Sequence, residues 1–259
     1  MYSRCLSISK VVRNVLRDVI RAVFVKSSRR PRLSARSSAN LNYEDPNISF
    51  YQCDITSPQQ ITDIANRIRS EIGEPSILIN NAGIGVSNTI LESTPETLRK
   101  IFDVNVISQW HLIRAFLPDM IKAKKGHILT IASLASFVGV PHMVDYCATK
   151  AAVLALHEGL SQELKYIYNC PQVKTSIFHP TYAKTPLVTA WESELRRNGV
   201  EILDPQAIAD AIIKQTISGK GGQIFVPERL SPSAAIRGLP TWLQVVIRDS
   251  VARGHQHCP

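Results

Sequence analysis

The sequence predicts an α/β fold of the doubly wound, Rossmann-like type, in which helices cover both faces of a mostly parallel sheet. Short, continuously apolar segments alternate along the chain with longer segments of helical periodicity, which is typical of parallel strands buried on both faces. The 259 residues suit one large domain, and 44% of them are hydrophobic, which allows a sizeable core.

The predicted elements alternate from residue 48 onward. Strands are expected at 48–54, 76–83, 126–133, 173–180 and 222–227, and the strand at 76–83 has the pattern of a buried strand. Helices are expected at 57–73, 94–123, 144–164 and 205–218. Ser57 suits the cap of the first helix, and Thr94 followed by Pro95 suits the start of the second. We divide the chain into a basic leader (1–42), a main domain (43–230) and a broken amphipathic tail (231–259).

The leader differs sharply in charge from the rest of the chain. It carries ten Lys or Arg and one acidic residue, Asp18, and therefore accounts for the whole formal charge of +9. Its apolar residues recur at helical spacing, and a segment rich in Ser and Arg follows them, which is typical of a mitochondrial transit peptide. An amphipathic helix packed on the domain explains the pattern equally well, whereas an arginine in every turn excludes a membrane span.

The composition also excludes several classes of function. Beyond residue 42 the basic and acidic residues are equal in number, so this part offers no electrostatic footprint for nucleic acid. The five cysteines are scattered, without a CxxC pair or metal-ligand spacing, so we expect neither a disulfide framework nor a metal site.

Polar residues that suit catalysis follow the ends of several predicted strands. Tyr146 and Lys150 stand one helical turn apart and share one face of a helix. Ser133 ends the strand before this helix, Asp54 ends the strand at 48–54, and Asn105 lies inside the long helix. Because ligands bind beyond the carboxyl ends of the strands in open α/β sheets, we expect these side chains at one edge.

These residue types fit the reduction of a carbonyl, which needs a hydride donor, a proton donor and a group that holds the developing oxyanion. A phenol with a pKa of about 10 is a slow acid or base at neutral pH, and a nearby ammonium favours the phenolate. We therefore expect Lys150 to lower the pKa of Tyr146 and Ser133 to donate to the substrate oxygen. Taken singly, Ser133 also fits a serine that only ends a strand, and Asn105 fits a solvated helix face.

Several motifs occur together, and from about residue 48 to 230 they resemble the short-chain dehydrogenase/reductase family. The likeness is greatest to its retinol and 17β-hydroxysteroid dehydrogenase branch. The matching residues are Asp54, NNAG at 80–83, NV at 105–106, Ser133, YCATK at 146–150 and HPTYAKT at 179–185. The family's Pro-Gly-x-Val-x-Thr motif is altered here, since Thr181 replaces its glycine and Ala183 its valine.

The resemblance implies an NAD(P)-dependent oxidoreductase that interconverts an alcohol and a carbonyl, and it implies a role for each matched residue. The implied catalytic residues are Asn105, Ser133, Tyr146 and Lys150, with Asn105 holding a water that relays protons to Lys150. The implied cofactor residues are Asp54 at the adenine, Asn81, Ala82 and Gly83 at its ribose, Tyr146 and Lys150, and Pro180, Ala183 and Thr185 around the nicotinamide.

The resemblance also implies that residues 186–205 form a mobile lid over the substrate. Together with the apolar tail, this lid suits a lipid-like substrate such as a retinoid, a steroid or a fatty aldehyde. The tail is expected to rest on a membrane surface, or else to pack on the core or at a dimer contact. We expect a homodimer or tetramer in the cytoplasm or at a membrane surface, with a mitochondrial location as the alternative that the leader suggests.

The family's glycine-rich phosphate loop is missing, because no glycine precedes Gly73. Backbone N–H groups of such a loop cradle the pyrophosphate, and the strand before the loop is central in the family's sheet. Residues 11–25 resemble the helix and second strand that normally follow, with the strand at 22–25. We therefore expect the first strand to be missing, the sheet to be opened and dinucleotide binding to be weak.

Two interpretations remain open at this point. Either the sequence is incomplete and represents an ordinary reductase, or the chain is a degenerate relative that acts as a binding or interaction module. The choice of cofactor is also open. Lys26, Arg29 and Arg30 follow the strand at 22–25 and favour NADP over NAD, unless this stretch is only a solvated basic linker.

Overall fold

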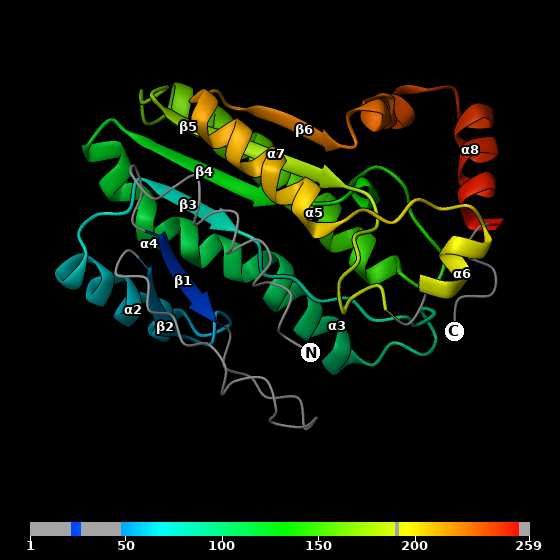
Figure 1. Ribbon diagram of the computed structural model, residues 1–259, viewed down its shortest axis with the longest axis horizontal. Coiled ribbons are helices and arrows are strands. Elements are labelled where there is room, and N and C mark those ends of the chain that lie inside the picture. Colours follow the sequence, from blue (N-terminus) through cyan, green and yellow to red (C-terminus); the bar gives the residue numbers. More distant parts are fainter. Residues whose placement is uncertain (1–21, 27–47, 190–191, 254–259) are drawn as a thin grey trace.

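The computed structural model describes residues 22–26, 48–189 and 192–253, and it confirms an α/β fold with helices on both faces of parallel strands (Figure 1). Most of the predicted leader lies outside the described residues, and so do Arg29 and Arg30. The interpretation of the leader as a transit peptide or packed helix therefore stays a prediction.

The described strands form two parallel sheets. In the first sheet, β1 (Ala22–Lys26) pairs with β2 (Ile48–Gln52), which confirms the strand predicted at 22–25. The second sheet has the order β3-β4-β5-β6. Its strands are β3 (Ile77–Asn80), β4 (Gly126–Ile131), β5 (Val173–Pro180) and β6 (Gly222–Val226). This division agrees with the expectation of an opened sheet.

The helices begin where their capping residues predict. Ser57 accepts from the Gln60 N–H at the start of α2 (Pro58–Glu71), and Thr94 accepts from the Thr97 N–H at the start of α3 (Pro95–Phe102). The later helices are α4 (Ser108–Lys122), α5 (Val144–Tyr166), α6 (Glu192–Arg197), α7 (Pro205–Ser218) and α8 (Thr241–Arg253). The tail is broken as expected, with a 3₁₀ segment over Glu228–Gly238 before α8.

Alternate residues of β4 bury into the two faces of the four-stranded sheet. Ile128 packs with residues of α2, α4 and α5, whereas Leu129 packs with Ile208 and Ile212 of α7. In Figure 1, α7 accordingly crosses one face while α4 and α5 lie on the other. The two-residue period of a strand therefore produces the two helical layers.

The strand predicted at 76–83 is less buried than its apolar sequence indicates. The Ile79 side chain is 39% exposed, and the strand itself ends at Asn80. Within the described residues β3 pairs on one side only, with β4, so no strand covers its other edge. The buried side-chain amide of Asn80 also has no hydrogen-bond partner there.

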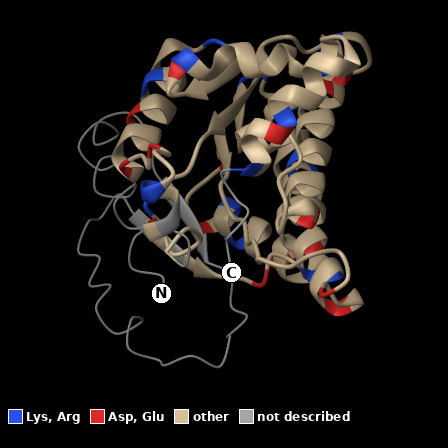
Figure 2. Cartoon of the chain, turned by 90° about the vertical axis from the view of Figure 1, so that its right-hand side faces the viewer, with Lys and Arg blue, Asp and Glu red and all other residues tan. Residues whose placement is uncertain are grey.

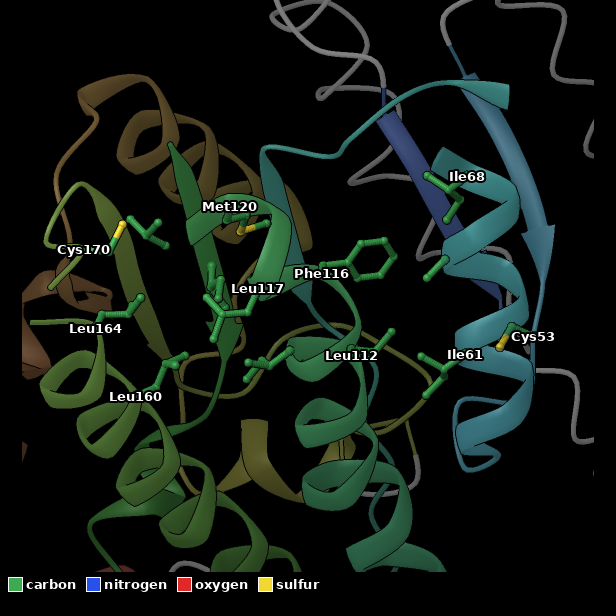
Figure 3. Close-up of a cluster of buried hydrophobic side chains, with 14 of the residues drawn as sticks. Cys53, Ile61, Ile68, Leu112, Phe116, Leu117, Met120, Leu160, Leu164 and Cys170 are labelled. Atoms are coloured by element: carbon green, nitrogen blue, oxygen red, sulfur yellow. The ribbon is translucent and has the colours of Figure 1, made fainter. Parts of the chain in front are cut away.

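A helical contact joins the two sheets instead. Figure 3 shows Ile61 and Ile68 of α2 turned toward Leu112 and Phe116 of α4. Arg69 of α2 adds an ion pair to Asp119 of α4, with 2.7 Å between the guanidinium nitrogen and the carboxylate oxygen. On its other side α4 packs toward α5, so one continuous apolar cluster runs from β2 to β5. We infer that α4 carries the connection that the strands do not make.

The helix predicted at 94–123 is continuous in direction but not regular. A π-helical turn, Asp103–Ile107, separates α3 from α4 and contains Asn105. The Gln109 side-chain amide donates to the Asn105 carbonyl at 2.9 Å, and so binds a backbone oxygen of this turn. Single π-helical turns occur frequently at functional sites, and the periodicity of the sequence did not reveal this one.

Acidic and basic residues are interspersed over the helices of the described part (Figure 2). This agrees with the equal numbers of both signs beyond residue 42. Among the described residues, none of the helices has both the length and the apolar character needed to cross a membrane.

The α2–α4 contact yields a stability prediction. Truncating Phe116 to alanine should lower the free energy of unfolding by about 3 to 5 kcal/mol, because a buried aromatic ring leaves a cavity. Hydrogen exchange should accelerate first in residues 48–71, since that unit relies on this contact. Urea unfolding followed by exchange mass spectrometry measures both effects.

Trp110→Ala is the matched control, because Trp110 lies on the same helix with 54% of its surface exposed. Its effect should stay within about 0.5 kcal/mol. Equal losses in the two variants, or uniform exchange in Phe116→Ala, would contradict the proposed role of α4.

Candidate functional site

The carboxyl ends of β4 and β5 meet the start of α5 and hold Ser133. Ser133 caps a short 3₁₀ turn, and its hydroxyl accepts from the Ala135 N–H at 3.2 Å. The same hydroxyl lies 3.5 Å from the Pro180 carbonyl oxygen, to which it donates. It also lowers the pKa of the buried Tyr146 phenol. The structure thus brings these two predicted catalytic residues close together.

The pKa of Tyr146 differs from the sequence-based expectation. Burial raises the pKa of this phenol to about 12, and the hydrogen bond with Ser133 offsets only part of the rise. The Lys150 ammonium lies 5.5 Å from the centre of the Tyr146 ring. The net shift is therefore upward, opposite to the expected direction, because desolvation of the phenolate is its largest cause and the ammonium is not among the groups that change this pKa.

Lys150 lies deep in the protein, and its Nζ donates to the Ile131 carbonyl at the end of β4, 2.9 Å away. Burial lowers the pKa of this amine to about 8. At neutral pH Lys150 is therefore still mostly protonated and stands beside a neutral phenol. Ionisable groups with strongly changed pKa values that lie side by side are typical of functional sites.

Asn105 is fully buried, with none of its surface exposed. The alternative that Asn105 is simply a residue on a solvated helix face is therefore excluded. Its side-chain oxygen accepts from the Ile84 N–H at 2.8 Å, and its side-chain nitrogen donates to the Ile84 carbonyl at 2.9 Å. The same nitrogen donates to the Thr149 hydroxyl at 3.0 Å. Asn105 therefore ties the segment after NNAG to the helix of Tyr146. Its role in proton relay stays a prediction.

The NNAG turn lies next to the buried amine. A Cβ atom added to Gly83 would lie 3.6 Å from the Asn105 side-chain oxygen and 3.7 Å from the Lys150 Nζ. Asn81, Ala82 and Gly83 are exposed, so their surface is open to a ligand at this edge. These are ordinary van der Waals distances, so the packing around Gly83 does not itself require a glycine.

The other predicted cofactor residues have local contacts. The Asp54 carboxylate, beyond the end of β2, accepts from both the N–H and the hydroxyl of Thr56. Ala183 forms a parallel bridge with Leu203, which uses backbone groups of its two neighbours. The Thr185 carbonyl accepts from the Val188 N–H at 2.9 Å. The structure does not bring Asp54, Ala183 or Thr185 against the four catalytic candidates, and their cofactor roles stay predictions.

Three residues around the site were missed by the sequence analysis. The Thr149 hydroxyl links Asn105 to the Tyr146 carbonyl, to which it donates at 2.7 Å. Gln109 binds the carbonyl of Asn105, and His179 binds the carbonyl of Ser133. Thr149 and His179 lie inside the YCATK and HPTYAKT motifs, so the sequence could have indicated that they lie near the site. Gln109 lies outside these motifs, and no sequence signal indicated its place near the site.

An apolar wall surrounds the Tyr146 ring. Leu187 lies against Gly85, which also packs on that ring. Further apolar residues of the same cluster come from three segments: Val140 and Met143 before α5, Val188 and Leu195 of the predicted lid, and Val251 of α8. The predicted lid and tail thus both contribute to the apolar cluster that contains Tyr146. Among the described residues, no three or more His, Cys, Asp or Glu gather as a metal site would require.

Comparison with known proteins defines the class to which this site belongs. The sequence profile described as short chain dehydrogenase matches residues 10–196. The chain belongs to the short-chain dehydrogenase family, whose members are NAD(P)-dependent oxidoreductases.

The individual relatives agree with this assignment. Dehydrogenase RED3 from Cochliobolus heterostrophus is 46% identical over 140 residues, covering 54% of this chain and 70% of that protein. Human estradiol 17-beta-dehydrogenase 11 is 30% identical over 206 residues, covering 79% of this chain and 67% of that protein. The chain spans only 49% and 44% of the length of two other curated relatives.

A solved structure shows the same fold. It is a short-chain dehydrogenase/reductase from Burkholderia phymatum in complex with NAD, with a TM-score of 0.65 and 23% sequence identity. The similarity covers 76% of this chain and 77% of that one.

The buried amine yields a second prediction, on stability. The unfolded chain has a lysine pKa near 10.5, whereas the native value is about 8, so the buried charge costs roughly 3 kcal/mol below pH 8. Lys150→Met should therefore stabilise the protein by about 1 to 3 kcal/mol at pH 7. Between about pH 8 and 10.5 the unfolded chain holds the extra proton, so wild-type stability rises and this advantage should shrink.

Denaturant unfolding at several pH values measures the effect. Lys165→Met on the exposed side of the same helix is the control, and its effect should lie within about 0.5 kcal/mol. A loss of stability in Lys150→Met at pH 7 would mean that the bond to Ile131 outweighs the burial of the charge.

Proposed function

We propose that the chain interconverts an alcohol and a carbonyl of a lipid-like substrate, using NAD(P), with Tyr146 as the group that transfers the proton. One observation carries this proposal: the buried Tyr146 phenol, whose pKa Ser133 lowers, lies beside the buried Lys150 ammonium, which is 5.5 Å from the centre of the Tyr146 ring. A module that only binds a partner has no evident use for a buried amine that costs stability. The alternative of a degenerate, non-catalytic relative is therefore less well supported.

The dinucleotide, when bound, supplies or accepts the hydride. The chain's own residues then handle the proton and the substrate oxygen. In reduction, Tyr146 gives its phenolic proton to the carbonyl oxygen while the Ser133 hydroxyl donates a hydrogen bond to that oxygen. In oxidation, Tyr146 takes the proton from the alcohol. A phenol with a pKa of about 12 is protonated at neutral pH, which favours the reducing direction there.

The site fits the two ends of a dinucleotide better than its middle. The exposed residues Asn81, Ala82 and Gly83 beside Lys150 suit the nicotinamide ribose and the adenine ribose. Pro180, Ala183 and Thr185 suit the nicotinamide. Asp54 would meet the adenine. The pyrophosphate needs backbone N–H groups without side chains in the way, and residues 1–72 contain no glycine to provide them.

The apolar wall supports a lipid-like substrate. The cluster that contains Tyr146 also includes or contacts aliphatic side chains such as Leu187, Val188 and Val251. Such a surface binds an apolar body and leaves only the reacting oxygen to be recognised by Ser133 and Tyr146. The name of the human relative, estradiol 17-beta-dehydrogenase 11, also supports a lipid-like substrate, since estradiol is a steroid.

Two further parts of the proposal concern contact with a membrane and the oligomeric state. Trp242, Val245 and Val246 are exposed on α8, which supports peripheral contact of the tail with a membrane surface. A homodimer or tetramer stays an expectation from the family resemblance. Neither affects the chemistry proposed for Tyr146.

Tyr146→Phe tests the reaction class. Removal of the phenolic proton should lower kcat at least 100-fold, since a general acid contributes that much or more, while dinucleotide binding stays unchanged. The assay follows NADPH oxidation at millimolar cofactor with long-chain aldehydes, retinoids and steroid ketones. Tyr166→Phe on the exposed end of the same helix should retain full activity.

Full activity in Tyr146→Phe would overturn the assignment of this residue. Activity confined to small polar ketones would keep the reaction class and remove the lipid-like substrate. A wild-type chain that turns over no alcohol or carbonyl, even at millimolar cofactor, would favour the non-catalytic alternative.

Cofactor affinity is the fourth prediction. We expect the chain to bind NADPH in preference to NADH, because Lys26 ends β1, Arg29 and Arg30 follow it in the sequence, and a basic group there pairs with a 2′-phosphate. Both should bind weakly, with a Kd of about 1 mM, because no glycine loop bonds the pyrophosphate. Fluorescence titration of the 259-residue chain measures both constants.

Substitution of Lys26 by methionine should remove the preference, while Lys165→Met should leave it. Tighter binding of NADH would contradict the choice of NADP. Micromolar binding of either dinucleotide would mean that other residues of the chain hold the phosphates.

A further inference from the structure

His179 is a fully buried side chain at the carboxyl end of β5, one residue before Pro180. Its ring centre lies 4.8 Å from that of Phe137 and 5.0 Å from that of Phe225, with which it stacks at 27°. Two aromatic rings therefore hold the imidazole and leave it little freedom to rotate. The orientation of its two nitrogens is fixed by this packing.

One nitrogen of the imidazole contacts the catalytic edge. The His179 Nδ1 lies 3.1 Å from the Ser133 carbonyl oxygen. Since a carbonyl can only accept, Nδ1 must carry the hydrogen and donate. The other nitrogen, Nε2, is buried and has no partner among the described residues. A phenylalanine would avoid the cost of that buried nitrogen, so the distinctive contribution of the histidine is its bond to Ser133.

The surroundings keep the imidazole neutral. Burial lowers the pKa of His179, and the nearby Lys150 lowers it further. His157 of α5 also interacts with it, and burial lowers the pKa of His157 to about 4. The bond to Ser133 opposes these effects only in part. At neutral pH His179 is therefore an uncharged donor, and adds no positive charge beside Lys150.

Two neighbouring residues of β5 thus hold Ser133 from both sides. His179 donates to its carbonyl, and Pro180 offers a carbonyl to its hydroxyl at 3.5 Å. The position of this hydroxyl decides whether it meets Tyr146. On the basis of the proposed function, we propose that His179 is a positioning residue, which fixes Ser133 so that its hydroxyl bonds the Tyr146 phenol and the substrate oxygen.

The test compares two variants that differ in the donor. His179→Phe keeps an aromatic ring between Phe137 and Phe225 but removes the N–H. His179→Asn places an amide N–H near the position of Nδ1 and should restore the bond. We expect a loss of about 10- to 100-fold in kcat for the first variant, with little change in KM, and partial recovery in the second.

The pH dependence separates positioning from mere stability. The Ser133 hydrogen bond lowers the pKa of Tyr146, so its loss should move the alkaline limb of the reduction profile to higher pH in His179→Phe. His179→Asn should move the limb back. His127→Phe is the matched control, because His127 is also buried but bonds Ser176 in the middle of β5, away from the end that holds Ser133. It should lower stability without moving the profile.

A readout without turnover tests the contact itself. Nitrogen NMR of protein labelled in histidine, with the signal assigned by its loss in His179→Asn, should show His179 neutral and protonated on Nδ1 at pH 7 to 8. Protonation on Nε2 instead would overturn the proposal. So would a His179→Phe variant with unchanged kcat and pH profile.

The same readout distinguishes this proposal from the function on which it rests. A wild-type chain with the Nδ1–H signal but without turnover would overturn the proposed function, and with it the catalytic purpose of the contact. Turnover that depends on Tyr146 but not on His179 would overturn only the role of His179.

Discussion

The parallel pairing of β4 with β5 is the constraint on which the candidate site depends. Their register sets Ile131 opposite Phe178, and the Ala132 N–H extends the ladder by donating to the Phe178 carbonyl. Both strands therefore end at the same edge. There the Ile131 carbonyl receives Lys150, and the end of β5 receives Ser133. A slip of one residue would turn these side chains to the other face and separate the site from α5.

Burial, rather than charge pairing, sets the electrostatics of this edge. It raises the pKa of Tyr146 and lowers that of Lys150, so both groups move toward their neutral forms. The ammonium is held by a carbonyl at the end of β4, which directs it away from any pairing with a carboxylate. The result is a protonated Tyr146 phenol beside a Lys150 ammonium whose pKa is lowered. In this state Tyr146 can donate a proton but cannot accept one.

Much of the fold and of the site could be predicted from the sequence, because the signals concerned are local. Helix starts followed from Ser57 and Thr94, and the pair Tyr146 and Lys150 followed from helical spacing. The exposure of Ile79 agrees with the expected loss of the first strand, but the segment itself does not reveal it, because an apolar strand has the same pattern whether or not a neighbour covers its edge. The π-helical turn and the pKa of Tyr146 depend on tertiary contacts and burial, which leave no periodic trace in the sequence.

The division of the strands separates the chemistry from part of the cofactor site. Ser133, Tyr146, Lys150 and Asn105 all belong to the four-stranded sheet or to helices packed on it, whereas Asp54 follows the two-stranded sheet. The two parts are joined by side chains of α2 and α4, not by backbone hydrogen bonds between strands of the described residues. Geometry at the proton-transfer edge therefore does not depend on the two-stranded sheet. The binding of a dinucleotide across both parts does, because any movement between α2 and α4 changes the distance from Asp54 to Lys150.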